Sequence, residues 1–264
     1  MQDKNAITKH TSDGIEALVW KSLRMDSTFL KMNRDEKKNV FLFRTFMSQL
    51  NKLSHDNCSK IKDKMQNLPI DTLPKLQKAV EIIHEKAINE KVFRSLYAQV
   101  CDLLKDKQFT DETGTSETFA SLLTNRCKEY FDVGLTENLV YERRKFEIDL
   151  ISCQETRKQQ LMEECLDEEN ESSKRFVGNC FFIAEVFKFG MIEKETLLEL
   201  IDCLFKLSGN VAAECIYAIF TTVGKFYEDN FGGMSSVYFD EIESLLNEDL
   251  YCRAFVFYYK MCWI

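Results

Sequence analysis

Apolar residues recur at helical spacing over residues 76–87, and the same spacing resumes at Phe93 and continues to Leu104. Side chains three or four positions apart share one face of an α-helix, so each stretch predicts an amphipathic helix. The break at residues 89–91 leaves room only for a tight turn. We therefore expect these two helices to form an antiparallel hairpin.

Similar apolar stripes follow along the rest of the chain. They predict a helix over residues 119–131, a long charged helix around 141–170, a pair over 176–187 and 197–205 joined by a turn at Gly190, a helix over 212–223, and a last pair over 237–246 and 251–261. Two polar stretches between these helices, residues 107–117 and 163–173, are expected to be mobile.

Two-helix units of roughly forty residues, each with one apolar stripe, are typical of an α-solenoid of the HEAT kind. We predict an all-α fold, an α-solenoid of about five HEAT-like antiparallel helix hairpins, over residues 40–264. A compact helical bundle is the structural alternative. Residues 1–39 form a flanking segment with one candidate amphipathic helix that would dock on the first repeat, formed by Ile15, Leu18, Val19 and Leu23.

Composition supports long helices and a large core. Hydrophobic residues make up 45% of the 264 positions, whereas only 9 glycines and 2 prolines occur to interrupt helices.

The 10 cysteines are scattered without CxxC pairs, so they are expected to be small core residues of a reducing compartment, and a zinc site is not expected. No apolar run approaches the ~20 residues that span a bilayer, and the first ten residues lack a signal peptide's apolar stretch. We expect a soluble protein of the cytoplasm or nucleus.

Charge is distributed unevenly around a formal net charge of −8. Residues 1–110 carry 20 Lys/Arg against 14 Asp/Glu, whereas residues 111–264 carry 15 against 29. This asymmetry favours phosphates as partners of the first half and a basic protein surface as a partner of the second. The alternative is a solvated, well-mixed surface.

Three basic clusters are candidate RNA contacts. Their members are Lys60, Lys62 and Lys64; Lys75 and Lys78; and Arg143, Arg144 and Lys145. Contacts of this kind reach phosphates, so binding would be weak, salt-sensitive and independent of RNA sequence. Taken singly, each cluster is also explained by lysines on the solvent face of a helix.

Catalytic motifs are absent from the sequence. There is no Gly-rich phosphate loop and no G-x-S-x-G turn, and the H-E-x-x-H pattern that starts at His84 lacks its second histidine. The acidic run around residues 163–169 is typical of a solvated helix face or loop rather than of an acid/base pair. The sequence therefore predicts no enzyme, no catalytic residue, no cofactor and no metal.

Several strings resemble the middle domain (MIF4G) of translation initiation factor 4 gamma, in the order of that family. They cover residues from about 42 to 264 and comprise residues 49–54 (QLNKLS), 83–88 (IHEKAI), 97–101 (YAQVC), 122–131 (LLTNRCKEYF), 178–192 (GNCFFIAEVFKFGMI) and 214–225 (ECIYAIFTTVGK). The resemblance implies a crescent of HEAT hairpins in the cytoplasm that binds initiation factor 4A, a two-lobed DEAD-box RNA helicase, and holds its lobes nearly closed. The resemblance also implies initiation factor 3 and RNA as partners, and it implies no association with a membrane.

By this resemblance, the helicase contact falls near the basic end of the chain. The expected helicase-binding residues are Asn51, Lys52, Leu53, Glu85, Lys86, Asn89 and Glu90. A second set carries the family's most recognisable motif and is expected to be mostly structural: Gly178, Asn179, Phe182, Ile183, Glu185 and Phe187.

The chain also departs from the family. Residues 255–264 (FVFYYKMCWI) are more apolar than the final helix of relatives, which puts a second helicase contact in doubt. The cap-binding-protein motif Tyr-x-x-x-x-Leu-apolar fails, because Tyr130 and Leu135 are followed by Thr136. Two alternatives to an initiation scaffold therefore stay open: an RNA-binding adaptor in mRNA processing, export or decay, and a translational repressor that sequesters the helicase.

Overall fold

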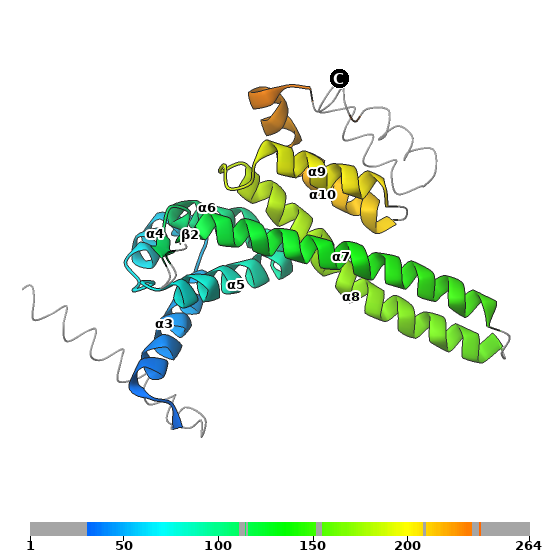
Figure 1. Ribbon diagram of the computed structural model, residues 1–264, viewed down its shortest axis with the longest axis horizontal. Helices are drawn as coiled ribbons and strands as arrows, with labels where there is room; N and C mark the ends of the chain where they lie inside the picture. Colours follow the sequence, from blue (N-terminus) through cyan, green and yellow to red (C-terminus); the bar gives the residue numbers. More distant parts are fainter. Residues whose placement is uncertain are drawn as a thin grey trace, which may run out of the picture.

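The computed structural model describes residues 31–110, 114, 116–151, 155–207, 210–233 and 238, and these residues are almost entirely helical (Figure 1). The elements are α3 (Arg34–Leu50), α4 (Cys58–Gln66), α5 (Leu73–Asn89), the 3-10 helix η1 (Lys91–Phe93), α6 (Arg94–Leu104), β1 (Gln108–Thr110), β2 (Ser116–Thr118), α7 (Phe119–Leu150), α8 (Glu155–Phe187), α9 (Lys194–Phe205) and α10 (Asn210–Phe231). The all-α prediction is confirmed. Helix α3 spans the boundary that we expected at residue 40.

Two of the expected helix pairs are confirmed. Helices α5 and α6 are joined by η1 at the expected break, where the Arg94 side chain donates to the carbonyls of Ala87 and Ile88 at 2.8 and 3.1 Å. These bonds satisfy carbonyls that a helix end leaves without partners. Helices α8 and α9 are joined at Gly190, whose φ of 70° is the left-handed conformation that glycine adopts readily. Apart from Tyr238, the last expected pair and the candidate helix at Ile15–Leu23 lie outside the described residues.

The helix boundaries expected between residues 119 and 170 are wrong. Helix α7 is continuous from Phe119 to Leu150, and α8 begins at Glu155. Gly134 does not interrupt α7, because the ring of Phe176 on α8 packs against it: a Cβ at Gly134 would lie 2.2 Å from that ring. The glycine therefore permits close helix packing, and a sequence pattern cannot tell this use from a helix break.

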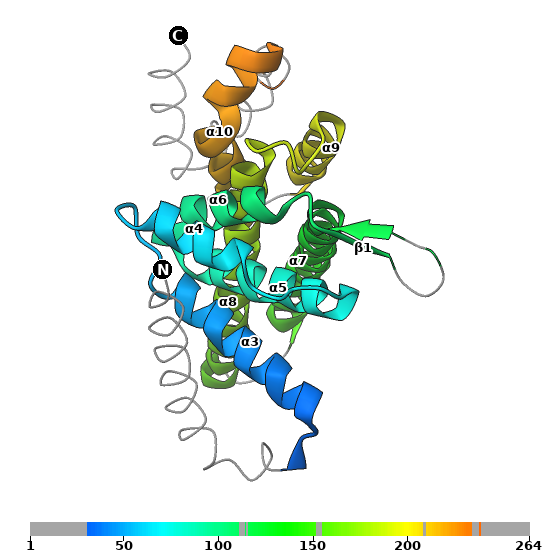
Figure 2. The same ribbon diagram turned by 90° about the vertical axis from the view of Figure 1, so that its left-hand side faces the viewer.

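Of the two stretches expected to be mobile, one lies within a helix, and the described ends of the other form a hairpin. Residues 163–173 belong to α8, where Cys165 and Glu169 are buried and Lys145 of α7 pairs with Glu169 at 2.7 Å. The ends of residues 107–117 lie in an antiparallel β-hairpin that pairs Gln108 with Thr118 and projects from the side of the helices (Figure 2). At residues 163–173, a contact between residues distant in sequence, Lys145 with Glu169, thus supports a helix despite the polar local composition.

One continuous apolar core runs from Phe46 on α3 to Tyr227 on α10. Helix α8 packs against α5, α6, α7 and α10, so it lies at the centre of the described helices (Figure 1). Six of the described cysteines are buried, in line with the expectation of core thiols: Cys58, Cys101, Cys127, Cys165, Cys180 and Cys215.

A buried polar junction joins α5, α7 and α8. The Asn179 side chain donates from Nδ2 to the Cys127 carbonyl at 2.9 Å, and its Oδ1 lies 2.9 Å from Nε2 of His84. Both Asn179 and His84 are fully buried. Next to them, Gly178 lets α8 approach α5 so closely that a Cβ there would lie 2.3 Å from the Ile88 carbonyl oxygen.

Replacing Asn179 with Ala should lower the free energy of unfolding by about 3 kcal/mol, because His84 and the Cys127 carbonyl both lose a buried partner. Urea denaturation measures the loss. The control is Asn125→Ala on the exposed side of α7, which should change stability by less than about 0.5 kcal/mol. Equal effects of the two substitutions would contradict a structural role for Asn179.

Burial lowers the pKa of His84 from 6.5 to about 4, although the hydrogen bond with Asn179 opposes this shift. The unfolded chain therefore binds the proton first as pH falls, and His84 destabilises the fold between about pH 6.5 and 4. From pH 7 to pH 5 its contribution should cost about 2 kcal/mol of unfolding free energy.

His84→Gln should remove this part of the acid sensitivity, whereas the exposed His55→Gln should leave it intact. Urea denaturation at both pH values makes the comparison. The role assigned to His84 is wrong if wild type and His84→Gln lose the same stability on acidification.

Candidate partner-binding surface

The C-terminal end of α5 carries a polar network that faces α3 and α6. Lys86 donates from Nζ to Asn51 Oδ1 at 2.8 Å and pairs with Glu90 Oε1 at 2.5 Å. The Tyr97 hydroxyl of α6 donates to the other oxygen of Glu90. Burial alone would raise the pKa of Glu90, but the hydrogen bonds from Lys86 and Tyr97 outweigh it and the pKa is lowered. Glu90 is therefore held as a carboxylate.

A second network lies one residue back along α5 and faces α8. Arg175 donates to both carboxylate oxygens of Glu85, at 2.8 and 2.9 Å, and also to the Tyr130 hydroxyl of α7. The hydrogen bonds from Arg175 lower the pKa of Glu85. Asn89 donates from Nδ2 to Glu85 Oε1 at 2.9 Å. A bidentate arginine of this kind fixes the carboxylate's orientation as well as its charge.

Helix periodicity explains why these side chains reach the surface together. His84, Ala87 and Ile88 point into the core, so positions 85 and 89, and 86 and 90, fall on the opposite side of α5. The structure thus brings Asn51, Glu85, Lys86, Asn89 and Glu90 into one surface, which we call the α5-end surface. Lys52 is exposed directly after Asn51.

Leu53 does not belong to this surface. Its side chain is 3% exposed and packs in the core, so the expectation of a helicase contact at Leu53 is wrong for the side chain. The turn that buries it is held by Asn57, which donates from Nδ2 to the Lys52 carbonyl at 2.6 Å and accepts from the Ser54 amide at 2.9 Å.

Sequence reasoning missed three members of the surface. Val92 is 76% exposed in η1 at the end of α5, beside the partly exposed Phe93. Arg175 is 90 residues from Glu85 in sequence, so no local pattern pointed to it. The sequence did indicate that Val92 would be exposed, because an apolar residue in a tight turn between two helices has few neighbours that could bury it. An exposed apolar residue next to polar groups is typical of a protein-binding site.

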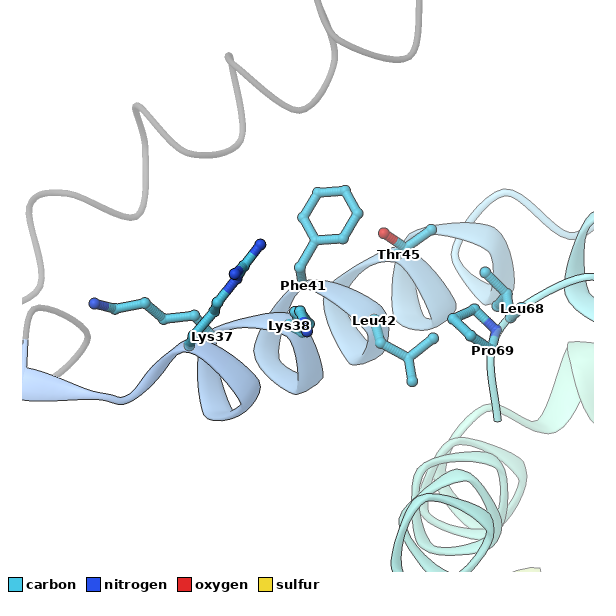
Figure 3. A pocket seen from close by; sticks show the side chains of 8 residues that line it. Lys37, Lys38, Phe41, Leu42, Thr45, Leu68 and Pro69 are labelled. Atoms are coloured by element: carbon cyan, nitrogen blue, oxygen red, sulfur yellow. The ribbon is translucent and has the colours of Figure 1, made fainter. Parts of the chain in front are cut away.

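Two hollows flank α3. One, of about 690 Å³, is lined by Val40, Phe43 and Met47 below a rim that includes Arg44, Lys52 and Lys78, and it continues the α5-end surface. The other is lined by Phe41 and Leu42 of α3 together with Leu68 and Pro69, and by Lys38 (Figure 3). None of the expected site residues lines this second hollow.

The structure separates the three basic clusters instead of joining them. Lys60, Lys62 and Lys64 lie on α4, whereas Arg143, Arg144 and Lys145 lie toward the far end of α7 (Figure 1). Most of these side chains have partners: Lys62 donates to Gln99, and ion pairs join Lys75 to Asp71, Lys78 to Glu81, Arg143 to Glu147, Arg144 to Glu168, and Lys145 to Glu142 and Glu169. Lys60 and Lys64 are exposed and make no ion pair with the described residues.

The residues of the 178–187 motif are mostly interior. Phe182 and Ile183 are fully buried, and Phe187 stacks on Tyr227 of α10 with a ring separation of 6.1 Å. Glu185 is partly exposed and pairs with Lys188 at 2.7 Å. Their geometry favours packing over partner contact.

Among the described residues, no group of three His, Cys, Asp or Glu side chains is arranged to hold a metal ion. Within the same residues, every helix is too short or too polar to cross a membrane.

Comparisons with known proteins identify relatives of this chain. Eukaryotic translation initiation factor 4 gamma 3 of Homo sapiens is 29% identical over 220 residues, which is 81% of this chain and 14% of that protein. Eukaryotic translation initiation factor 4 gamma 1 of Mus musculus is 30% identical over 217 residues, with the same two coverages of 81% and 14%. The chain thus spans a small part of these curated relatives.

The fold itself has a solved counterpart. The MIF4G domain of Trypanosoma cruzi translation initiation factor EIF4G5 superposes with a TM-score of 0.54 at 18% identity, covering 79% of this chain and 88% of that one. The family model for the MIF4G domain matches residues 43–254. With its helical solenoid and this match over most of its length, the chain belongs to the MIF4G domain family.

Proposed function

We propose that this chain is a non-enzymatic, cytoplasmic scaffold or regulator of translation initiation that binds the DEAD-box helicase initiation factor 4A through the α5-end surface. The observation that carries the proposal is the exposed Val92, two residues after Glu90, together with the hydrogen-bonded groups of Asn51, Glu85 and Glu90 at the end of α5. The relatives' names support translation initiation as the setting.

The surface is suited to binding because its polar groups are already fixed. Lys86 and Arg175 hold the carboxylates of Glu90 and Glu85 in place, so little side-chain entropy remains to be lost when a partner docks. The apolar side chains of Val92 and Phe93 supply the area to be buried.

The mechanism follows from differential affinity. A scaffold that binds the near-closed arrangement of the two helicase lobes more tightly than the open one shifts the helicase population toward the near-closed arrangement. The size of the shift is set by the ratio of the two affinities. The scaffold needs no contact with ATP. Initiation factor 3 is a further partner that this proposal allows on other repeats.

The double variant Lys52→Glu/Val92→Gln should bind initiation factor 4A at least about tenfold more weakly than wild type, because it reverses a charge and removes an exposed apolar side chain. Both side chains are exposed, so the fold should persist. Fluorescence anisotropy with labelled helicase measures the affinity, and Lys64→Glu on α4 is the charge-matched control.

Each outcome has a distinct meaning. If wild type does not bind the helicase, the proposed function is wrong; if the double variant binds like wild type, the contact lies elsewhere on the chain. The RNA-stimulated ATPase rate of the helicase then separates a stimulating scaffold, which raises it, from a sequestering repressor, which lowers it.

An RNA-binding adaptor is the second candidate, and the observation that favours it is the pair of unpaired lysines on α4. The double variant Lys60→Glu/Lys64→Glu should weaken binding to single-stranded RNA and reduce the slope of log affinity against log salt by about 2. Filter binding over a salt series measures this slope. Lys52→Glu/Val92→Gln serves as the reciprocal control, and an unchanged slope in the α4 variant would remove α4 as an RNA contact.

A further inference from the structure

Helix α3, which lies at one end of the described helices and packs mainly on α4 and α5, carries a second apolar face besides the one that it buries (Figure 1). The buried face is formed by Leu42, Phe46 and Leu50. Val40, Phe43 and Met47 follow one another at intervals of three and four residues, so they share another face of the helix. Val40 and Phe43 are half-buried, and Met47 is 39% exposed. This second face forms the floor of the hollow of about 690 Å³ beside α3, which we call the α3 hollow.

The α3 hollow is large and elongated. Its volume lies within the range of about 300–1,000 Å³ in which ligand sites fall. The lining runs along α3 from Asn39 to Lys52, just past the end of the helix, which is a length of about 20 Å at the helical rise. Lys78 joins the lining from α5. A hollow of this shape suits a segment of chain several helical turns long.

Basic side chains surround the apolar floor. Arg44, Lys52 and Lys78 line the hollow, and no Asp or Glu among the described residues does so. Arg44 and Lys52 are exposed and make no ion pair with any described residue, whereas Lys78 pairs with Glu81 at 2.7 Å. A partner therefore meets a positive potential at the hollow, although the net charge of the chain is −8.

The apolar floor and the basic rim together select the partner. We infer that the α3 hollow binds an amphipathic acidic helix of another protein, with large apolar side chains on one face and Asp/Glu on its flanks. The apolar face covers Val40, Phe43 and Met47, while the carboxylates meet Arg44 and Lys52. Helices α3 and α5 bond their backbone groups internally, so an extended segment would find no backbone partner here, whereas a helix satisfies its own.

Two other occupants fit less well. Single-stranded RNA would bring phosphates to the basic rim, but its bases stack on exposed aromatic faces, and the half-buried Phe43 is the only aromatic residue in the described lining. The candidate helix at residues 15–24 of this chain carries Lys21 and Arg24 against Glu16, so its net charge has the wrong sign.

The test uses the full chain and a labelled, designed helical peptide of about 15 residues, with leucine at helical spacing and glutamate elsewhere. Fluorescence anisotropy should show saturable binding to wild type. Val40→Gln/Met47→Gln should bind at least about tenfold more weakly, because the floor loses its apolar contacts. Leu139→Gln/Phe146→Gln removes two exposed apolar side chains of α7 instead and should bind like wild type. Circular dichroism checks that both variants fold.

The basic rim is tested by Arg44→Gln/Lys52→Gln, which changes only exposed side chains, so the fold should persist. This variant should bind the peptide at least about tenfold more weakly at low salt, and the difference should shrink as salt screens the charges. Lys60→Gln/Lys64→Gln on α4 is the charge-matched control and should bind like wild type. A matched peptide with lysine in place of glutamate should bind at least about tenfold more weakly than the acidic peptide.

The assignment is overturned if the acidic peptide does not bind, if the lysine peptide binds equally well, or if either hollow variant binds like wild type. Displacement of the peptide by single-stranded RNA would reassign the hollow to RNA. A dimer in sedimentation velocity that Val40→Gln/Met47→Gln abolishes would reassign it to a second copy. Tighter peptide binding by Leu18→Gln/Leu23→Gln would reassign it to the chain's own first residues.

Peptide binding does not require that initiation factor 4A bind the α5-end surface. Val92→Gln, which lies on that surface and outside the lining of the hollow, should bind the peptide like wild type. Failure of the peptide to bind and failure of the helicase to bind are therefore separate results.

Discussion

The buried amide of Asn179 is the interaction on which the arrangement of the central helices depends. It links three segments far apart in sequence, since its two polar atoms meet His84 of α5 and the Cys127 carbonyl of α7. In an apolar interior such groups are costly without partners, so these two hydrogen bonds favour the relative placement of the three helices that forms both of them. Because His84 is neutral at physiological pH, this junction carries no net charge.

The relative placement of α5, α7 and α8 also determines which side chains lie on the α5-end surface. Gly178 lets α8 approach the end of α5, and Arg175, nearly one turn earlier on α8, then reaches Glu85. The register that buries His84, Ala87 and Ile88 turns Glu85, Lys86, Asn89 and Glu90 outward. The proposed helicase surface is thus a direct consequence of how the core packs.

The distal halves of α7 and α8 extend as a two-helix arm beyond the other described helices (Figure 1), and the interactions along this arm change with distance from the core. Near the junction the two helices pack through large apolar groups such as Phe131 and Phe176, whose ring centroids are 5.3 Å apart. Farther out, ion pairs and a few buried side chains such as Ile148 and Cys165 hold them together. The core and the distal halves of these helices are therefore stabilised by different interactions.

The sequence by itself determined the fold class, the α5–α6 hairpin, the turn at Gly190 and the family, because helical periodicity and short ordered strings are local properties. It also pointed to most residues of the α5-end surface, through the resemblance. Only the tertiary structure decided that Leu53 is buried, that Gly134 and residues 163–173 lie within continuous helices, and that Arg175 meets Glu85. Each of these depends on a contact between residues distant in sequence, namely Phe176 against Gly134, Lys145 with Glu169, and Arg175 with Glu85. A one-dimensional pattern does not specify such contacts, because the same local sequence is compatible with several packing partners.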